Sequence, residues 1–341
     1  MDSLSKSILA TVIYCDVFNF PLTSLEIYHF LINPGRISKV IHIQGRTLYE
    51  SYPQVRSNSA ESLAEVVDYL DILVQNGKLG EKNGFYFLPG RQNLYHERIE
   101  KNKIAELKWK KTRRYLFWVQ AIPFIEAVFA SGSLALGHTD KNSDLDVLVV
   151  AKKGRIWLAR VLISLAMSLL GVRRKNKDKM APDKICLNHY IAVDSLKIPF
   201  ESLYTAQSYA HLIPLYWKNR TVVENFWKAN RLWMEKFLRQ WEWPWAYQKR
   251  AIQANRLLAW FRFVGENFLD RTGLADWLEK LARYLQLRRI NTYLPGRVIA
   301  NDWQLEFHPF SEEKEILQKY NRKISFLGIF GDYQESDSGL R

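Results

Sequence analysis

The stretch that decides the fold is residues 130–150, ASGSLALGHTDKNSDLDVLVV. Two small residues, Gly132 and Ser133, stand near its start, and Asp144 and Asp146 come ten residues later, just before an apolar run. Alternate residues of a strand share a face, so the two carboxylates point the same way, about 6.6 Å apart at ~3.3 Å per residue. Two bare carboxylates repel each other, and a pair of hard divalent cations such as Mg²⁺ relieves that repulsion. The stretch therefore predicts a metal-binding carboxylate pair at the mouth of a buried strand.

The Gly-Ser pair at residues 132–133 predicts a contact with phosphate. A residue without a side chain lets phosphate approach the backbone closely. The Ser133 hydroxyl and the amides of the following turn can then hold phosphate oxygens. If Leu134–Gly137 begins a helix, the N-terminus of that helix adds a positive dipole end facing the phosphate.

The motif as a whole is similar to a known family signature. Gly132-Ser133, a ten-residue spacer and then Asp144-Leu145-Asp146 resemble the signature of the DNA polymerase β-type nucleotidyltransferase superfamily, and with Ser143 the acidic end reads SDLD. The SDLD form is most similar to that of the small bacterial members, the minimal and aminoglycoside-type nucleotidyltransferases. The alternative is a surface loop whose aspartates are only solvated, and the correct spacing of Gly-Ser from the acidic pair favours the site.

The resemblance implies a reaction and a set of site residues. It implies that Gly132, Ser133 and Ser143 contact the nucleotide and that Asp144 and Asp146 bind two Mg²⁺ ions. In the implied reaction an acceptor hydroxyl attacks the α-phosphate of a nucleoside triphosphate (NTP), with ATP as the expected donor, and pyrophosphate is released.

Family members carry a third carboxylate on a later strand, often the base that activates the acceptor. The matching strand here is KICLNHYIAV, residues 184–193, and its middle position is Asn188. An amide oxygen can bind a metal but is no base at neutral pH. Four alternatives for this position therefore stay open. Asn188 itself completes a site that differs from the family pattern, or Asp183 or Asp194 takes the role of the third carboxylate. Otherwise the substrate supplies the base, or the domain is degenerate. Strand alternation places His189 on the other face.

Residues 1–90 show three helical segments, a loop over residues 34–58 and a hairpin that turns at Asn83-Gly84. This order resembles a winged helix-turn-helix. Its third helix, which would read DNA, carries acidic residues and no Lys or Arg, and such a face repels phosphate. We therefore do not expect DNA binding, and favour protein–protein or intramolecular docking. The acidic residues are Glu61, Glu65, Asp68 and Asp71.

The chain divides into four predicted parts. After the winged-helix-like domain (1–90) come a basic linker helix (91–120), a nucleotidyltransferase domain (121–200) and a helical C-terminal domain (201–341). The fold class is thus α/β (α+β), with a central mixed sheet. The resemblance implies that the helical C-terminal domain shapes the acceptor site.

Three features outside the motif leave functional and structural alternatives open. The basic run KNKIAELKWKKTRR in the linker helix is either a solvated face or a wall that attracts phosphate. The basic loop over residues 173–179 is either solvated or a guide for nucleotide or RNA. His138, between the two halves of the motif, either contacts phosphate or is solvent-exposed, and we expect solvent exposure. After residue 200 a hairpin is expected at Val298–Phe307. The aromatic residues there are expected to form helix-bundle core rather than to stack on bases, among them Trp217, Trp227 and Trp233.

Composition narrows the class of protein further. The 341 residues are 48% hydrophobic and carry a formal net charge of +14, which allows a sizeable core and favours a polyanionic partner: nucleotide, nucleic acid or anionic lipid head groups. Cys15 and Cys186 read as free thiols of a reduced cytoplasm, and no leader is recognised at the N-terminus. The most apolar segment, residues 156–171, is short for a span of roughly 20 residues, so we expect a buried helix and no membrane partner.

The sequence leaves two functional hypotheses. The leading one is an Mg²⁺-dependent nucleotidyltransferase that moves a nucleoside monophosphate (NMP) from an NTP to an acceptor hydroxyl. A small molecule such as an antibiotic, a protein hydroxyl and an RNA 3′ end all stay open as acceptors. The second is a non-catalytic, nucleotide-sensing regulator that couples a degenerate transferase domain to the winged helix. Asn188 supports the second hypothesis, and the intact Asp144/Asp146 pair opposes it.

Overall fold

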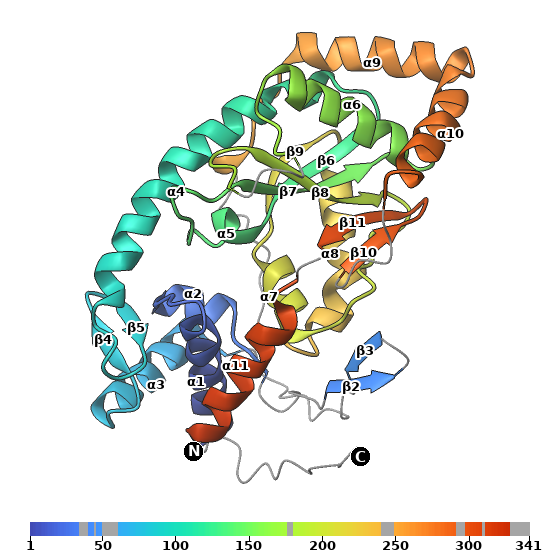
Figure 1. Ribbon diagram of the computed structural model, residues 1–341. Coiled ribbons are helices and arrows are strands. Elements are labelled where there is room, and N and C mark those ends of the chain that lie inside the picture. Colours follow the sequence, from blue (N-terminus) through green and yellow to red (C-terminus); the bar gives the residue numbers. More distant parts are fainter. Residues whose placement is uncertain are drawn as a thin grey trace.

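A six-stranded mixed sheet forms the centre of the molecule (Figure 1). The structure is a computed structural model, and it describes residues 1–33, 40–43, 46–49, 61–175, 180–239, 249–290, 297–308 and 311–327. The strand order is β10-β11-β8-β7-β6-β9, with β7 and β8 parallel and every other neighbouring pair antiparallel. The strands are β6 (Ile125–Ala130), β7 (Leu145–Ala151), β8 (Ile185–Ala192), β9 (Ile213–Trp217), β10 (Arg297–Ala300) and β11 (Gln304–His308). This is the mixed α+β fold that the sequence predicts.

The pairing of β6, β7 and β8 brings the motif residues to one edge of the sheet. Both β6 and β7 are apolar and almost wholly buried, as expected for central strands. Ala130 at the end of β6 pairs with Val147, and Asp146 pairs with Cys186 of β8. The chain therefore turns at residue 131 directly beside the start of β7.

Helices cover both faces of the sheet. One face packs against the long helix α4 (Leu94–Leu116), the 3-10 helix η2 (Phe117–Ala121), α6 (Ile156–Leu169) and α10 (Leu274–Leu287). The opposite face packs against α7 (Leu203–Ala210) and α8 (Arg220–Met234). Helix α9 (Arg256–Arg271) lies at the outer edge, against η2 and α10 (Figure 1).

The N-terminal region shares its hydrophobic core with the C-terminal helices. It comprises α1 (Ser3–Asp16), β1 (Leu22–Thr23), α2 (Ser24–His29), α3 (Leu63–Gln75), β4 (Gly80–Lys82) and β5 (Phe85–Phe87). Buried residues of this region form one cluster with residues of α7, α8 and α11 (Glu313–Phe326). The rings of Tyr14 and Tyr320 meet edge to face at 5.6 Å, and Lys323 pairs with Asp16. The structure thus shows intramolecular docking of this region.

Several local expectations for the N-terminal region are met and one is wrong. The hairpin β4–β5 turns at Asn83 and Gly84, both with positive φ, as the Asn-Gly signal predicts. The third helix begins with a capping box at Ser62. Residues 34–58 are not a continuous loop, because β2 (Val40–Ile43) pairs with β3 (Arg46–Tyr49). The rest of that segment lies outside the described residues.

The region after residue 200 is less helical than expected. Residues 213–217 form β9, an edge strand of the central sheet. This strand was not predicted from the sequence, because the segments on both sides of it have helical patterns. The hairpin β10–β11 is present as predicted, and the break at residues 241–245 lies outside the described residues. Trp227 and Trp233 are buried and Trp217 packs against the core, which confirms their structural reading.

The segment 156–171 forms α6, which is buried on one face and leaves Val161, Leu165 and Leu169 exposed on the other. The expectation of a buried helix therefore holds for one face only. Across the described residues, none of the helices has both the length and the apolar character that crossing a bilayer requires. Cys15 and Cys186 are free, as predicted.

The shared core yields a prediction about unfolding. Tyr320 is fully buried between α11 and α1, so Tyr320→Ala should lower the free energy of unfolding by about 3–5 kcal/mol. Phe326→Ala, in the same helix but 89% exposed, should change it by less than about 0.5 kcal/mol. Chemical denaturation followed by circular dichroism measures both. Equal effects of the two substitutions would contradict the shared core.

Candidate functional site

The two predicted carboxylates and one thiol lie together at the edge where β7 and β8 start. Asp144 immediately precedes β7, Asp146 is its second residue, and Cys186 lies opposite on β8. One ligand atom from each of the three lies within 4.8 Å of the others. Sequence analysis placed the carboxylates side by side but treated Cys186 as an ordinary core thiol. The pairing of Asp146 with Cys186 across the parallel strands brings the thiol there.

Gly132 leaves room for the Asp146 carboxylate. Its φ is +62°, in the left-handed region, and a Cβ built there would lie 2.6 Å from Asp146 Oδ2. Residues Gly132–Ala135 form the single-turn helix α5, which starts two residues earlier than expected. The Ser131 amide donates to the Asp146 carbonyl at 3.0 Å and continues the β6–β7 ladder. The glycine is therefore required by the protein's own carboxylate, which is a different reason from the phosphate contact that the sequence suggested.

The carboxylates of Asp144 and Asp146 repel each other, and neighbouring groups offset part of this repulsion. Burial, and then the negative charge of Asp144, raise the pKa of Asp146 to about 6. Arg174 forms an ion pair with Asp144 and lies 3.9 Å from the Cys186 sulfur. Burial, and then Asp146, raise the pKa of the Cys186 thiol, which stays protonated and hydrogen-bonds to Asp146. The cation and the thiol donor offset part of the repulsion between the two carboxylates.

Asn188 faces the carboxylate pair from β8. Its amide nitrogen lies 3.5 Å from Asp146 Oδ1 and donates to Nε2 of His308 at 2.8 Å. Nδ1 of His308 in turn donates to Glu306 at 3.1 Å. Glu306 and His308 come from β11, more than a hundred residues away in sequence, and no local pattern marked them. Where family members carry the third carboxylate, this chain therefore has the Asn188 amide, which is hydrogen-bonded to the His308–Glu306 pair.

The two other acids considered for the third position lie elsewhere. Asp194 follows β8 at its far end and pairs with Lys153. It is eight residues beyond Cys186, or about 26 Å at ~3.3 Å per residue. Asp183 pairs with Lys108 and Lys111 of α4, and these cations lower its pKa despite partial burial. A carboxylate held by two ammonium groups is a weak base, so neither acid substitutes for Asn188.

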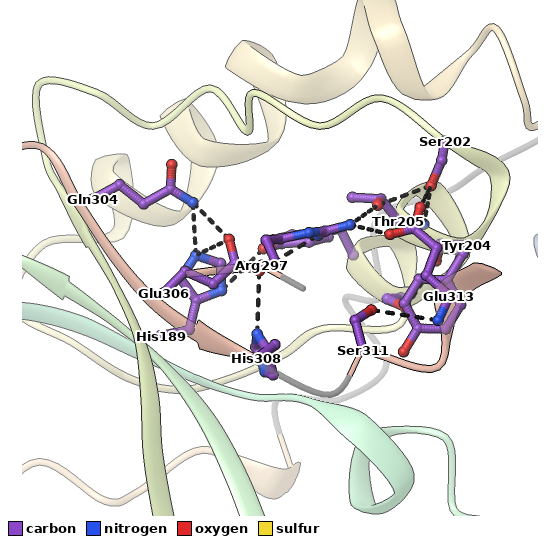
Figure 2. Close-up of polar contacts among 12 residues, drawn as sticks. His189, Ser202, Tyr204, Thr205, Arg297, Gln304, Glu306, His308, Ser311 and Glu313 are labelled. Atoms are coloured by element: carbon purple, nitrogen blue, oxygen red, sulfur yellow. Dashed lines mark hydrogen bonds and ion pairs between the residues drawn. The ribbon is translucent and has the colours of Figure 1, made fainter. Parts of the chain in front are cut away.

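A buried polar network supports the β11 side of the site (Figure 2). Glu306 accepts hydrogen bonds from Gln304 at 2.9 Å and from His308, and pairs with Arg297 at 3.4 Å. Arg297 also pairs with Glu313 of α11. The expectation that strand alternation turns His189 away from the site is wrong, because the register of β7 and β8 shifts between Asp146 and Leu148 and His189 pairs with Leu148. The ring centroid of His189 lies 6.3 Å from that of His308, and Nδ1 of His189 contacts the Tyr209 hydroxyl at 3.0 Å. Burial lowers the pKa of His189 to about 4, so the ring is neutral at pH 7.

Helix α4 holds the loop between the two halves of the motif. The buried ammonium of Lys108 donates to the carbonyls of Lys141 and Ser143, at 3.2 and 2.7 Å. The Ser143 hydroxyl accepts from the Asp140 amide, so it closes the loop. His138 is half-buried and hydrogen-bonds to Lys101, which corrects the expectation of solvent exposure. Part of the basic run is therefore structural. Lys177 and Lys179 of the other basic loop lie outside the described residues.

The donor set fits a hard divalent cation. Asp144 and Asp146 offer carboxylate oxygens, which are ligands that Mg²⁺ accepts. Asn188 presents its amide nitrogen to Asp146 and His308, so its amide oxygen becomes a ligand only when the side-chain amide turns over. The protonated Cys186 thiol is not a ligand for Mg²⁺. Ser133 lies half-buried in α5, next to this group in the chain. The edge of the sheet can therefore bind a metal and present it beside the Gly132-Ser133 turn.

Comparison with known proteins gives one match. A family model described as Nucleotidyltransferase domain matches residues 116–216, from the end of α4 to β9. This span contains the Gly-Ser turn, both carboxylates and Asn188. Searches of curated proteins and of solved structures returned no match. The match supports the nucleotidyltransferase part of the resemblance, and nothing in the comparisons supports a winged-helix domain at residues 1–90.

The contact between Gly132 and Asp146 predicts the effect of adding one methyl group. Gly132→Ala should displace the Asp146 carboxylate and weaken Mn²⁺ binding at least ~10-fold, as changes beside metal ligands typically do. Gly154→Ala is the matched control, because Gly154 has φ +65° but nothing within 4 Å of its Cβ position. Electron paramagnetic resonance titration with Mn²⁺ measures both. If both variants bound Mn²⁺ as the wild type does, Gly132 would not be shaping the metal site.

Proposed function

We propose that the chain is an Mg²⁺-dependent nucleotidyltransferase, which moves an NMP from an NTP, with ATP as the expected donor, to an acceptor hydroxyl and releases pyrophosphate. The observation that carries the proposal is the Asp144/Asp146 pair packed against Gly132, inside the span that matches the nucleotidyltransferase family model. The domain boundaries predicted from the sequence, and the role of the C-terminal helices in shaping the acceptor site, belong to the same proposal.

Each residue of the site has a role in this proposal. Asp144 and Asp146 hold the metal ions, which when bound neutralise the phosphates and polarise the α-phosphate for attack. The Gly132-Ser133 turn contacts the triphosphate. Arg174 supplies a cation that can leave Asp144 for a phosphate oxygen, because its side chain is 37% exposed to solvent. Two carboxylates and one arginine thus provide both signs of charge that the reaction needs.

The proton of the acceptor hydroxyl needs a base that Asn188 cannot provide. We assign this role to His308, whose Nδ1–H is held by the buried Glu306 and whose Nε2 accepts from the Asn188 amide at 2.8 Å. The turn of that amide which would give its oxygen to the metal would also free Nε2 to take up a proton. The acceptor oxygen forms a bond to the α-phosphorus, the bond from that phosphorus to the pyrophosphate oxygen breaks, and the proton passes to Nε2. A carboxylate-oriented histidine is a common general base, so the pair can replace the family's third carboxylate.

A second candidate function is a nucleotide-sensing regulator without turnover. The observation that favours it is Asn188 at the third position, combined with the Arg174–Asp144 ion pair that occupies one carboxylate. In this case the winged-helix-like region would transmit the nucleotide state to a partner. Nucleotide binding without any transfer of label, at every acceptor offered, distinguishes this function from catalysis.

The carboxylate pair should be required for transfer. Incubation of the full chain with α-labelled NTP, Mg²⁺ and cell lysate should label an acceptor, and Asp144→Asn or Asp146→Asn should reduce labelling at least ~100-fold through loss of the metal. Asp140→Asn removes an exposed carboxylate of the same loop and should leave labelling unchanged. Unchanged Mg²⁺-dependent nucleotide binding in both site variants would exclude this site.

The base assignment predicts a rescue. His308→Gln should lower turnover by about 10²–10⁴-fold, because it removes the group that takes up the proton. Asn188→Asp should tighten Mg²⁺ binding, because it adds one negative charge beside Asp146. In the double variant the new carboxylate should restore part of the turnover. Wild-type rates for His308→Gln at every pH would show that His308 is not the base.

A further inference from the structure

Helix α9 holds Arg262 and Glu266 against the protein, beside the buried Leu258, and leaves most of its large apolar residues exposed. On the inner side, the buried Glu266 carboxylate accepts from the Phe124 amide at 2.9 Å and pairs with Lys218 at 2.8 Å. Arg262 donates to the Tyr216 hydroxyl, and Gly265 lies against Pro123. These bonds fix the rotation of α9 about its axis. An ordinary surface helix has the opposite arrangement.

The outer side of α9 is a continuous apolar surface, which we call the α9 face. It lies along the edge of the molecule, where Figure 1 shows no described element beyond it. Single exposed apolar residues are normal, but a contiguous patch of this kind marks an interaction surface. The exposed side chains of the α9 face are Leu257 (62%), Trp260 (55%), Phe261 (52%), Phe263 (61%), Val264 (43%) and Phe268 (59%).

A basic cavity adjoins the start of α9. It has a volume of about 530 Å³ and is lined by Lys110, Arg113 and Arg114 of α4, with Phe117, Trp118, Ile252 and Gln253. No carboxylate of the described residues forms an ion pair with any of the three cations. We call this hollow the basic cavity.

The basic cavity and the α9 face are held together as one surface. Gln120 of η2 accepts from the Asn255 amide, at the N-cap of α9, at 2.8 Å. Its amide group also donates to the Gln253 carbonyl at 3.2 Å. Trp118, which lines the cavity, is 48% exposed. Three cations that have no ion pair with a described residue therefore stand next to an aromatic-rich apolar helix face.

We propose that the α9 face and the basic cavity dock the protein on the surface of an anionic phospholipid membrane. A helix that lies in the membrane interface buries Trp, Phe and Leu side chains at the acyl boundary and keeps Lys and Arg at the level of the head groups. The basic cavity takes a lipid phosphate, and the α9 face takes the adjoining acyl chains. This docking is independent of the nucleotidyl transfer proposed above.

The other two classes of occupant fit less of this surface. Single-stranded nucleic acid stacks on aromatic rings and pairs with cations, but it gives no partner to aliphatic side chains such as Leu257 and Val264. A second copy of the chain would cover the apolar residues, but it would bring together two molecules of formal net charge +14 and leave the three cations without counter-charges.

Flotation of the full chain with lipid vesicles tests the proposal. Binding is expected to vesicles of phosphatidylcholine with phosphatidylglycerol, to be far weaker to phosphatidylcholine alone, and to fall with added salt. The double variants Phe261→Ser/Phe268→Ser and Arg113→Glu/Arg114→Glu should each reduce binding at least ~10-fold. Phe326→Ser and Lys228→Glu, an exposed aromatic residue and an exposed lysine on other helices, should leave binding unchanged.

Three results would overturn the proposal. One is the absence of flotation with anionic vesicles by the wild type. Another is a dimer in light scattering that Phe261→Ser/Phe268→Ser converts to monomer, which would assign the α9 face to a second copy. The third is tight binding of single-stranded RNA that Arg113→Glu/Arg114→Glu abolishes while vesicle binding persists, which would assign the basic cavity to nucleic acid.

Discussion

The close approach of the Gly132 backbone to the Asp146 carboxylate is the constraint on which the candidate site depends. A side chain at residue 132 would lie 2.6 Å from Asp146 Oδ2, so the turn after β6 can pass the start of β7 only with glycine there. Asp146 lies partly buried between this turn and Asp144, and its burial and then the negative charge of Asp144 raise its pKa to about 6. The geometry costs free energy, and the surrounding residues offset that cost with donors: Arg174, the Cys186 thiol and the Asn188 amide. Each of these donors faces the position that a divalent cation would neutralise.

The remainder of the fold holds this arrangement from two sides. On one side, the buried ammonium of Lys108 fixes the loop before Asp144 through two backbone carbonyls. On the other, Arg297 connects Glu306 of β11 with Glu313 of α11, and α11 packs on the N-terminal helix α1 through Tyr320 and Tyr14. The N-terminal region is thus linked to His308 through a chain of packed and charged contacts. That link gives the regulator hypothesis a physical route, because α11 and β11 connect the N-terminal region to the side chains around Asn188 and Asp146.

The parts of the fold that sequence analysis predicted are those with local signals. Strands β6, β7 and β8 follow from apolar runs, the β4–β5 hairpin follows from Asn83-Gly84, and the carboxylate pair follows from its spacing to Gly132. The unpredicted parts depend on contacts between distant residues. The pair Glu306–His308 reaches Asn188 only through the pairing of β11 with β8, and Cys186 reaches Asp146 only through the parallel register of β7 and β8. Strand β9 is five residues long and its apolar pattern is equally compatible with a helix. The outward orientation of the α9 face is set by the partners of Glu266, which no helical periodicity reveals.

The most direct measurement of the central claim is a crystal structure of the chain with Mn²⁺ and a non-hydrolysable ATP analogue. The account predicts anomalous density for Mn²⁺ between the carboxylates of Asp144 and Asp146. It also predicts that the triphosphate lies over the Gly132-Ser133 turn and that Arg174 is displaced from Asp144 toward a phosphate oxygen. Mn²⁺ and nucleotide bound elsewhere on the protein, with the Arg174–Asp144 ion pair intact, would contradict the assignment of this edge of the sheet as the nucleotidyl transfer site.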